Sequence, residues 1–163
     1  MNLRVSYNWL REYLPGLKAS PEEVAEKLSL HSFSVERWKR MDEGLDPSIV
    51  VGKILEIEKH PNADKLRLVR CSARGGSGVR CQIVCGGANL YVGQLVAVAL
   101  PGAKVRWRGE GEPVELKPAE IRGVKSEGMI CAANEIGLYE VFPHKEREIL
   151  DLTTTGARVG ESV

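Results

Sequence analysis

Short apolar runs separated by turn residues fill the chain from residue 49 to residue 132, and this pattern restricts the fold more than any other feature. The runs are 49–59, 65–72, 79–85, 95–100 and 128–132. Runs of this length between Gly, Pro and Asn predict β-strands, and five of them favour a small barrel. The fourth run is entirely apolar, which predicts a central strand covered on both faces.

The connection before the last run is long and polar, spanning residues 104–118. This connection argues against a simple four-stranded meander and favours the five-stranded Greek-key barrel called the OB-fold. In the second run, Leu66 and Leu68 alternate with two cations, but Val69 breaks the alternation. A β-bulge near Val69 would return Val69 or Cys71 to the core.

The first 40 residues have a different pattern, typical of a small α+β segment. Ser6 is placed to cap a first helix, and the capping box Ser20-Pro21-Glu22-Glu23 begins a second. Residues 33–40 alternate as a strand does. Two short helices and one strand bury too little surface to fold alone, so we expect this segment to pack against other protein.

Positive charge is concentrated in the middle of the chain, although the whole chain carries only +1. Residues 51–108 contain 10 Lys or Arg and 3 Asp or Glu, whereas residues 109–163 are acidic. On the second and third runs and the hairpin between them, the cations are Lys65, Arg67, Arg70, Arg74 and Arg80. In an OB-fold this is the surface that usually binds nucleic acid, so the pattern predicts an RNA-binding face.

A second basic group surrounds a tryptophan in the long connection. Lys104, Arg106 and Arg108 flank Trp107. An exposed Trp107 would offer a surface on which a base can stack. A buried Trp107 would instead close the end of the barrel, and we expect this more ordinary role.

Other kinds of site find little support in the sequence. No phosphate-binding glycine loop of the known types occurs, and His31, His60 and His144 are far apart. The four cysteines lack the paired spacing of a zinc site and lie among apolar residues, which predicts buried thiols in a reducing compartment. No apolar run reaches the ~20 residues that a membrane-spanning helix needs.

Several segments resemble, in order, a tRNA-binding OB domain shared by translation proteins. They are VVGKILEIEKHPNADKLRLVRC, QIVCGGANLYVGQLVAVALPGAKV and IRGVKSEGMICAANEIGL. The opening MNLRVSYNWLREYL, followed by SPEEVAEKLSLHSFSVE, resembles the amino-terminal segment of bacterial phenylalanyl-tRNA synthetase β chains, which contain such a domain.

The resemblance implies a non-catalytic, cytoplasmic, tRNA-binding part of a class II phenylalanine–tRNA ligase. Its partners would be tRNA, the remainder of the β chain and an α chain in an (αβ)₂ assembly, with no membrane contact. ATP and Mg would belong to the complete synthetase, and this fragment would hold no cofactor. We divide the chain into a helical segment (1–40), a linker (41–48), the OB domain (49–150) and the start of chain returning to the helical segment (151–163).

The family's tRNA-facing motif maps onto Asn62 and Lys65 and onto Ser126, Glu127 and Met129. Asn62 and Ser126 would hydrogen-bond sugar or phosphate, Lys65 would supply charge and Met129 would offer apolar surface to a base. Glu127 is expected to make a structural hydrogen bond, because phosphate repels a carboxylate.

Alternatives remain for these residues and for the whole chain. Residues 62–64 suit an Asx-type turn, and Gly128 with Met129 suits closure of the barrel by the last strand. The chain as a whole could be a free-standing dimeric, structure-selective tRNA-binding protein. It could also be a protein-interaction OB domain that makes no RNA contact.

Overall fold

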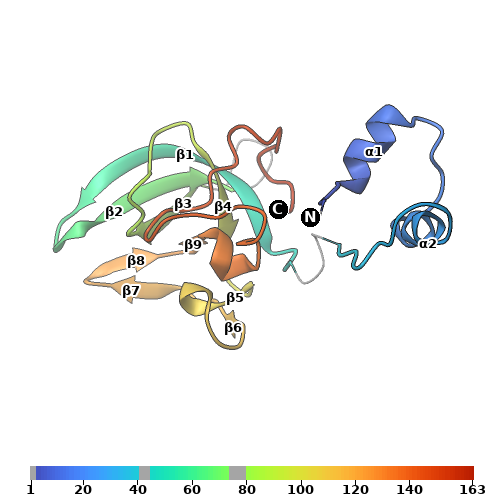
Figure 1. Cartoon of the computed structure of the whole chain (residues 1–163). Coiled ribbons are helices and arrows are strands. Elements are labelled where there is room, and N and C mark those ends of the chain that lie inside the picture. The colour runs from blue at the N-terminus through green and yellow to red at the C-terminus, as the bar shows by residue number, and fades with distance from the viewer. Residues whose placement is uncertain (1–2, 41–44, 74–79) are drawn as a thin grey trace. The chain divides into compact units, whose positions relative to one another are not determined.

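The computed structural model describes residues 3–40, 45–73 and 80–163. The chain divides into two compact units, Met1–Glu43 and Gly44–Val163, which are described separately (Figure 1). Within the described ranges, no helix has the length and apolar character needed to cross a membrane.

The first unit contains the two predicted helices, α1 (Tyr7–Tyr13) and α2 (Pro21–His31). The predicted capping box is confirmed, because the Ser20 hydroxyl accepts from Glu23 N at 3.2 Å and the Glu23 carboxylate accepts from Ser20 N at 2.7 Å. Ser6 caps α1 as expected. Neither helix contains a buried residue, so caps and local hydrogen bonds account for the helices better than packing does.

The strand predicted at residues 33–40 is wrong. These residues have no regular secondary structure, and no strand of the described part of this unit pairs with them. Phe33 and Trp38 are both exposed. Alternation identifies a segment that suits a sheet, but a strand also needs a neighbour to complete its hydrogen bonds.

The second unit is built on a five-stranded antiparallel sheet in the order β3-β2-β1-β4-β9. Its strands are β1 (Ile49–His60), β2 (Ala63–Ser72), β3 (Arg80–Cys85), β4 (Leu95–Ala99) and β9 (Met129–Ile130). They correspond to the five predicted runs and confirm a mainly β, OB-like fold. The central position of β4 is confirmed as well, since residues 96–99 are all buried.

The long connection between β4 and β9 contains the remaining short elements. These are β5 (Lys104–Val105), the 3₁₀ turn η1 (Trp107–Gly109), β6 (Val114–Glu115), β7 (Ala119–Ile121) and β8 (Val124–Ser126), and a second 3₁₀ turn, η2 (Ala133–Ile136), follows β9. β5 pairs with β6, and β7 pairs with β8. The sheet closes where the segment after β8 meets β3, because Glu127 N donates to Gln82 O at 2.9 Å.

The β-bulge was predicted near Val69 in β2, but at this level of the sheet the extra residue is in β1. β2 pairs with β3 in continuous register, so Val69 and Cys71 lie on one face of β2 and both are fully buried. The β1–β2 pairing shifts register twice: between Ile54 and Glu56, where β1 has the extra residue, and between Lys59 and His60, where β2 has extra residues near the hairpin tip. The extra residue in β1 bends the sheet, and the inward face of β2 simply follows the alternation of Val69 and Cys71.

The other predicted features of this unit concern thiols and chain ends. All four cysteines are buried and unbridged, and burial raises the pKa of Cys85 to about 11.

In the predicted linker, Asp46 accepts hydrogen bonds from Ser48 N and Lys104 N. Residues 151–163 lie along the barrel, where Leu152 N donates to Leu95 O at 2.8 Å. Their predicted return to the helical segment stays a prediction.

Candidate nucleic-acid interface

Two hairpin tips meet at one end of the barrel, as Figure 1 shows for β1–β2 and β7–β8. His60 is buried and joins them, because its Nε2 lies 3.1 Å from Ile121 O while its Nδ1 accepts from Asn62 N at 3.0 Å. Asn62 adds a second link by donating from Nδ2 to Arg122 O at 3.0 Å. The exposed Asn62 is therefore held in place on a rigid support.

The cations predicted to form one basic face on β2 are divided between its two faces. Lys65 is exposed, whereas Arg67 is half-buried and donates from Nη1 to Asp64 O and Leu66 O, both at 3.0 Å. Arg70 points to the opposite face and pairs with Glu56 at 3.1 Å. Alternation over the regular part of β2, from Arg67 to Ser72, puts Arg67 and Arg70 on opposite faces, and this contradicts the prediction of a single continuous face.

Two of the predicted cations cannot be placed fully. Arg74 lies outside the described residues. The backbone of Arg80 pairs with Ser72, but its side chain is outside the described part of the chain. Their predicted contacts with tRNA stay predictions.

The segment 125–128 closes the barrel, which changes the role of Ser126. Ser126 is 3% exposed, and its hydroxyl accepts from Val84 N at 3.0 Å and donates to Gly128 O at 2.9 Å. The predicted RNA contact of Ser126 is therefore wrong for this conformation, because the hydroxyl is already occupied and shielded. Its place at the closure of the sheet gives it a structural role.

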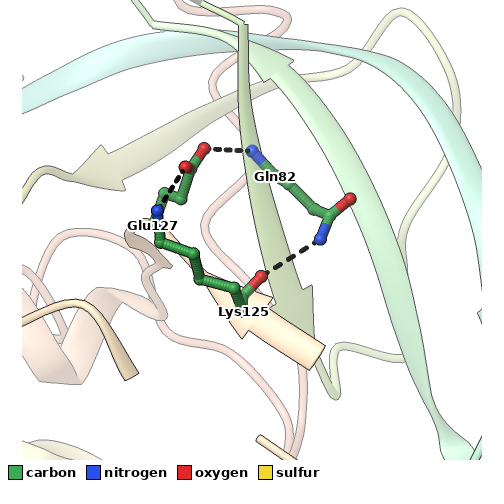
Figure 2. A network of polar contacts seen from close by, with 3 residues as sticks. All are labelled: Gln82, Lys125 and Glu127. Carbon is green, nitrogen blue, oxygen red and sulfur yellow. Dashed lines mark hydrogen bonds and ion pairs between the residues drawn. The ribbon is translucent and has the colours of Figure 1, made fainter. Parts of the chain in front are cut away.

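Glu127 makes the structural contacts predicted for it, as Figure 2 shows. Its carboxylate accepts from Lys125 Nζ at 3.1 Å and from Gln82 N at 3.3 Å. Gln82 also donates from Nε2 to Lys125 O at 3.1 Å. The hydrogen bonds from Lys125 and from the Gln82 N–H together hold the pKa of Glu127 below its usual value.

Trp107 is 64% exposed, so the expectation that it closes the barrel is wrong. Its turn is nonetheless fixed, because Arg106 N donates to Glu135 O and Asn134 Nδ2 donates to Arg108 O, both at 2.8 Å. Lys104, Arg106 and Arg108 are exposed as well. An exposed aromatic ring that neighbours exposed cations in the chain suits base stacking.

A cavity of about 300 Å³ lies beside this turn. Lys104 and Arg106 line it together with Asp46 and Glu135. Burial raises the pKa of Glu135, whose carboxylate accepts from Ala132 N at 2.7 Å. The balanced charges of this wall make the cavity a weaker anion site than the exposed ring and cations next to it.

Comparison with known protein families identifies the family to which this barrel belongs. Residues 49–161 match the family described as "Putative tRNA binding domain". The chain belongs to this tRNA-binding domain family.

Relatives of this tRNA-binding domain protein are phenylalanine–tRNA ligase β subunits. Those of Chlorobium chlorochromatii and Latilactobacillus sakei are 41% and 40% identical to it, over 83% and 88% of this chain. That of a Synechococcus strain is 45% identical over 83% of this chain. The chain spans 16–17% of the length of these relatives. The C-terminal domain of Plasmodium vivax p43 is 26% identical, covers 55% of this chain and 46% of its own, and has a TM-score of 0.38.

Met129, the last motif residue, is half-buried in β9 and packs against the core of the tRNA-binding domain. Gly128 before it is required by close packing, because a Cβ there would lie 2.8 Å from Ala99 O. This geometry supports the expected role of the Gly128-Met129 pair in closing the barrel. Part of the Met129 side chain remains accessible, and its contact with a base stays a prediction.

Sequence reasoning missed two arginines that the fold brings to the predicted site. Arg122 occupies the β7–β8 tip beside Asn62. Arg147 reaches β2 and the end of β3, donating to Gly86 O at 3.0 Å and to Lys65 O at 3.5 Å. The Arg-Gly pair at 122–123 was a visible hairpin signal, but its neighbours depend on contacts between residues 60 apart.

The structure also shows the surroundings of the histidines and of the candidate metal ligands. The ranges 3–40, 45–73 and 80–163 contain no cluster of His, Cys, Asp and Glu that could hold a metal ion. The His60 imidazole is used between the hairpins. His144 Nδ1 is buried and has no hydrogen-bond partner among the described residues, and it lies beside a cavity of about 300 Å³ that both apolar and polar residues line.

Proposed function

We propose that this chain is the tRNA-binding part of a phenylalanine–tRNA ligase β subunit and is not catalytic by itself. The observation that carries the proposal is the match of residues 49–161 to a tRNA-binding family on a barrel that presents Asn62 and Lys65 at one end. In the assembled cytoplasmic class II enzyme it would support attachment of phenylalanine to tRNA. ATP and Mg would bind elsewhere in that enzyme.

The relatives also favour a β subunit over a free-standing tRNA-binding dimer. The alignment of 136 residues is longer than the second unit, residues 44–163, so it includes part of the first unit. That unit exposes large apolar side chains, among them Trp9, Leu14, Leu30 and Phe33. We propose that they pack against the remainder of the β chain, which would pair with an α chain in an (αβ)₂ assembly.

Binding of tRNA by the 163-residue chain tests the proposal directly. If roughly four phosphates are neutralised, the slope of log affinity against log salt should be near −3, from ~0.7–0.9 per contact. Filter binding over a salt series measures this slope. Lys65→Ala should weaken binding to all tRNAs alike, whereas Arg158→Ala removes an equal charge from the C-terminal segment and should leave binding unchanged. A flat salt response would contradict the proposal and favour a protein-interaction domain.

Trp107 offers a separate test of base stacking. In the Trp9→Phe/Trp38→Phe variant it is the single tryptophan, and its 64% exposure should give red-shifted emission. Stacking on a base should quench that emission when tRNA is added. Unchanged emission with bound tRNA would place Trp107 outside the interface.

A further inference from the structure

Three non-glycine residues in the described parts of the chain have positive φ, and all three are exposed arginines. They are Arg108 (φ 56°), Arg122 (φ 50°) and Arg147 (φ 64°). The left-handed region is unfavourable for residues with a Cβ, whereas glycine adopts it freely. A side chain retained in such a conformation needs either a structural or a functional reason.

Arg147 has a structural reason. Its guanidinium donates to Gly86 O, and its own carbonyl accepts from Ala88 N at 2.8 Å. The side chain therefore ties the C-terminal segment to the end of β3. This contact offsets the unfavourable backbone conformation, and Arg147 serves as an internal comparison for Arg122.

Arg122 has no such structural reason. It and Gly123 form the two-residue loop between β7 and β8, and φ is positive at both positions. This is the pattern of a type I′ turn, whose first position favours Asn over arginine. Only the backbone carbonyl of Arg122 is used, by Asn62. No carboxylate of the described residues pairs with its guanidinium.

The surroundings of Arg122 point to an anionic ligand. Among the described residues, Arg70 and Lys125 pair with glutamates, whereas Arg122 has no such pair, as is also true of other exposed cations such as Lys65. Its backbone is bonded to Asn62, a residue expected to face tRNA, and His60 ties the same two hairpins together. A guanidinium can bind a phosphate through two parallel N–H donors, and its planar shape reduces the entropy lost per hydrogen bond.

We propose that Arg122 binds a tRNA phosphate beside Asn62, and that this contact is why arginine stands where Asn would be preferred. The inference rests on the proposed tRNA-binding function. It adds a contact that no local pattern in the sequence indicates, and it extends the interface from the β1–β2 hairpin to the β7–β8 hairpin.

Arg122→Asn is the decisive variant, because it creates the favoured Asn-Gly turn while removing the charge. We expect its melting temperature to equal or exceed that of the unchanged chain. Its tRNA affinity should fall by about fivefold to tenfold, and its salt slope should shrink by roughly 0.7–0.9. Arg122→Lys keeps a charge at the same place and should bind within about threefold of the unchanged chain. Arg158→Ala controls for net charge.

The outcomes separate this inference from the proposed function. If the unchanged chain shows no salt-dependent binding, the proposed function fails and the inference fails with it. If the unchanged chain binds but Arg122→Asn binds with equal affinity and slope, only the inference is overturned. It is also overturned if Arg122→Lys loses as much affinity as Arg122→Asn, or if Arg122→Asn melts at a lower temperature.

Discussion

Replacing Ser126 by alanine tests whether the closure of the barrel or the RNA explains this residue. The change removes the acceptor of the Val84 N–H and one donor to the Gly128 carbonyl, at a site that is 3% exposed. A buried N–H that is left without an acceptor costs about 1–3 kcal/mol in the free energy of unfolding. The Gly128 carbonyl loses one donor but keeps a second lone pair that can accept, so its loss contributes less. We therefore expect a loss of about 2 kcal/mol in the free energy of unfolding, mainly from the Val84 N–H.

Thermal unfolding followed by circular dichroism measures this loss. For a unit of this size, about 2 kcal/mol corresponds to a fall of roughly 6–10 °C in melting temperature. Ser72→Ala is a matched control, because the Ser72 hydroxyl makes no hydrogen bond within the described part of the chain. Below its melting temperature, Ser126→Ala should bind tRNA as the unchanged chain does. Unchanged stability together with weaker binding would refute the structural role.

Two further changes test the closure of the barrel and the buried carboxylate. Gly128→Ala places a Cβ 2.8 Å from Ala99 O and should cost roughly 1–3 kcal/mol, whereas Gly16→Ala, with no atom within 4 Å, should cost far less; equal melting temperatures would contradict the packing account. Burial raises the pKa of Glu135 above its ordinary value of 4.5, so the folded state binds the proton more tightly than the unfolded state does. The free energy of unfolding therefore falls as the pH rises from 4.5 through the raised pKa of the folded protein. Glu135→Gln keeps an acceptor for Ala132 N and should lack this fall in urea unfolding at acidic and neutral pH; an identical pH dependence would show that Glu135 is not responsible.

Much of the barrel could be predicted because its strands carry local signals. The entirely apolar run that became β4 is buried on both faces, as such a run requires. The capping box at Ser20 likewise depends on atoms only three residues apart. The strand expected at 33–40 failed because its hydrogen bonds needed a partner that a local pattern cannot supply.

The site was harder to predict than the fold. Counting cations on β2 suggested one basic face, yet alternation sends Arg67 and Arg70 to opposite sides, and Glu56 pairs with Arg70. The exposure of Trp107 could not be predicted either, because it depends on the hydrogen bond by which Asn134 of η2 fixes the turn. Charge and aromatic content can be counted in a sequence, but the direction of a side chain depends on register and packing.

The sequence by itself determined the five strands of the sheet, where the helices of the first unit begin and that the middle of the chain is basic. The strands and helices follow from backbone preferences and hydrogen bonds that span only a few residues, and the charge follows from composition. Only the tertiary structure placed Ser126 inside the closure of the barrel and brought Arg122 against Asn62, which is 60 residues away along the chain. Such contacts exist only after the sheet has closed, because strand order and register set which distant residues meet.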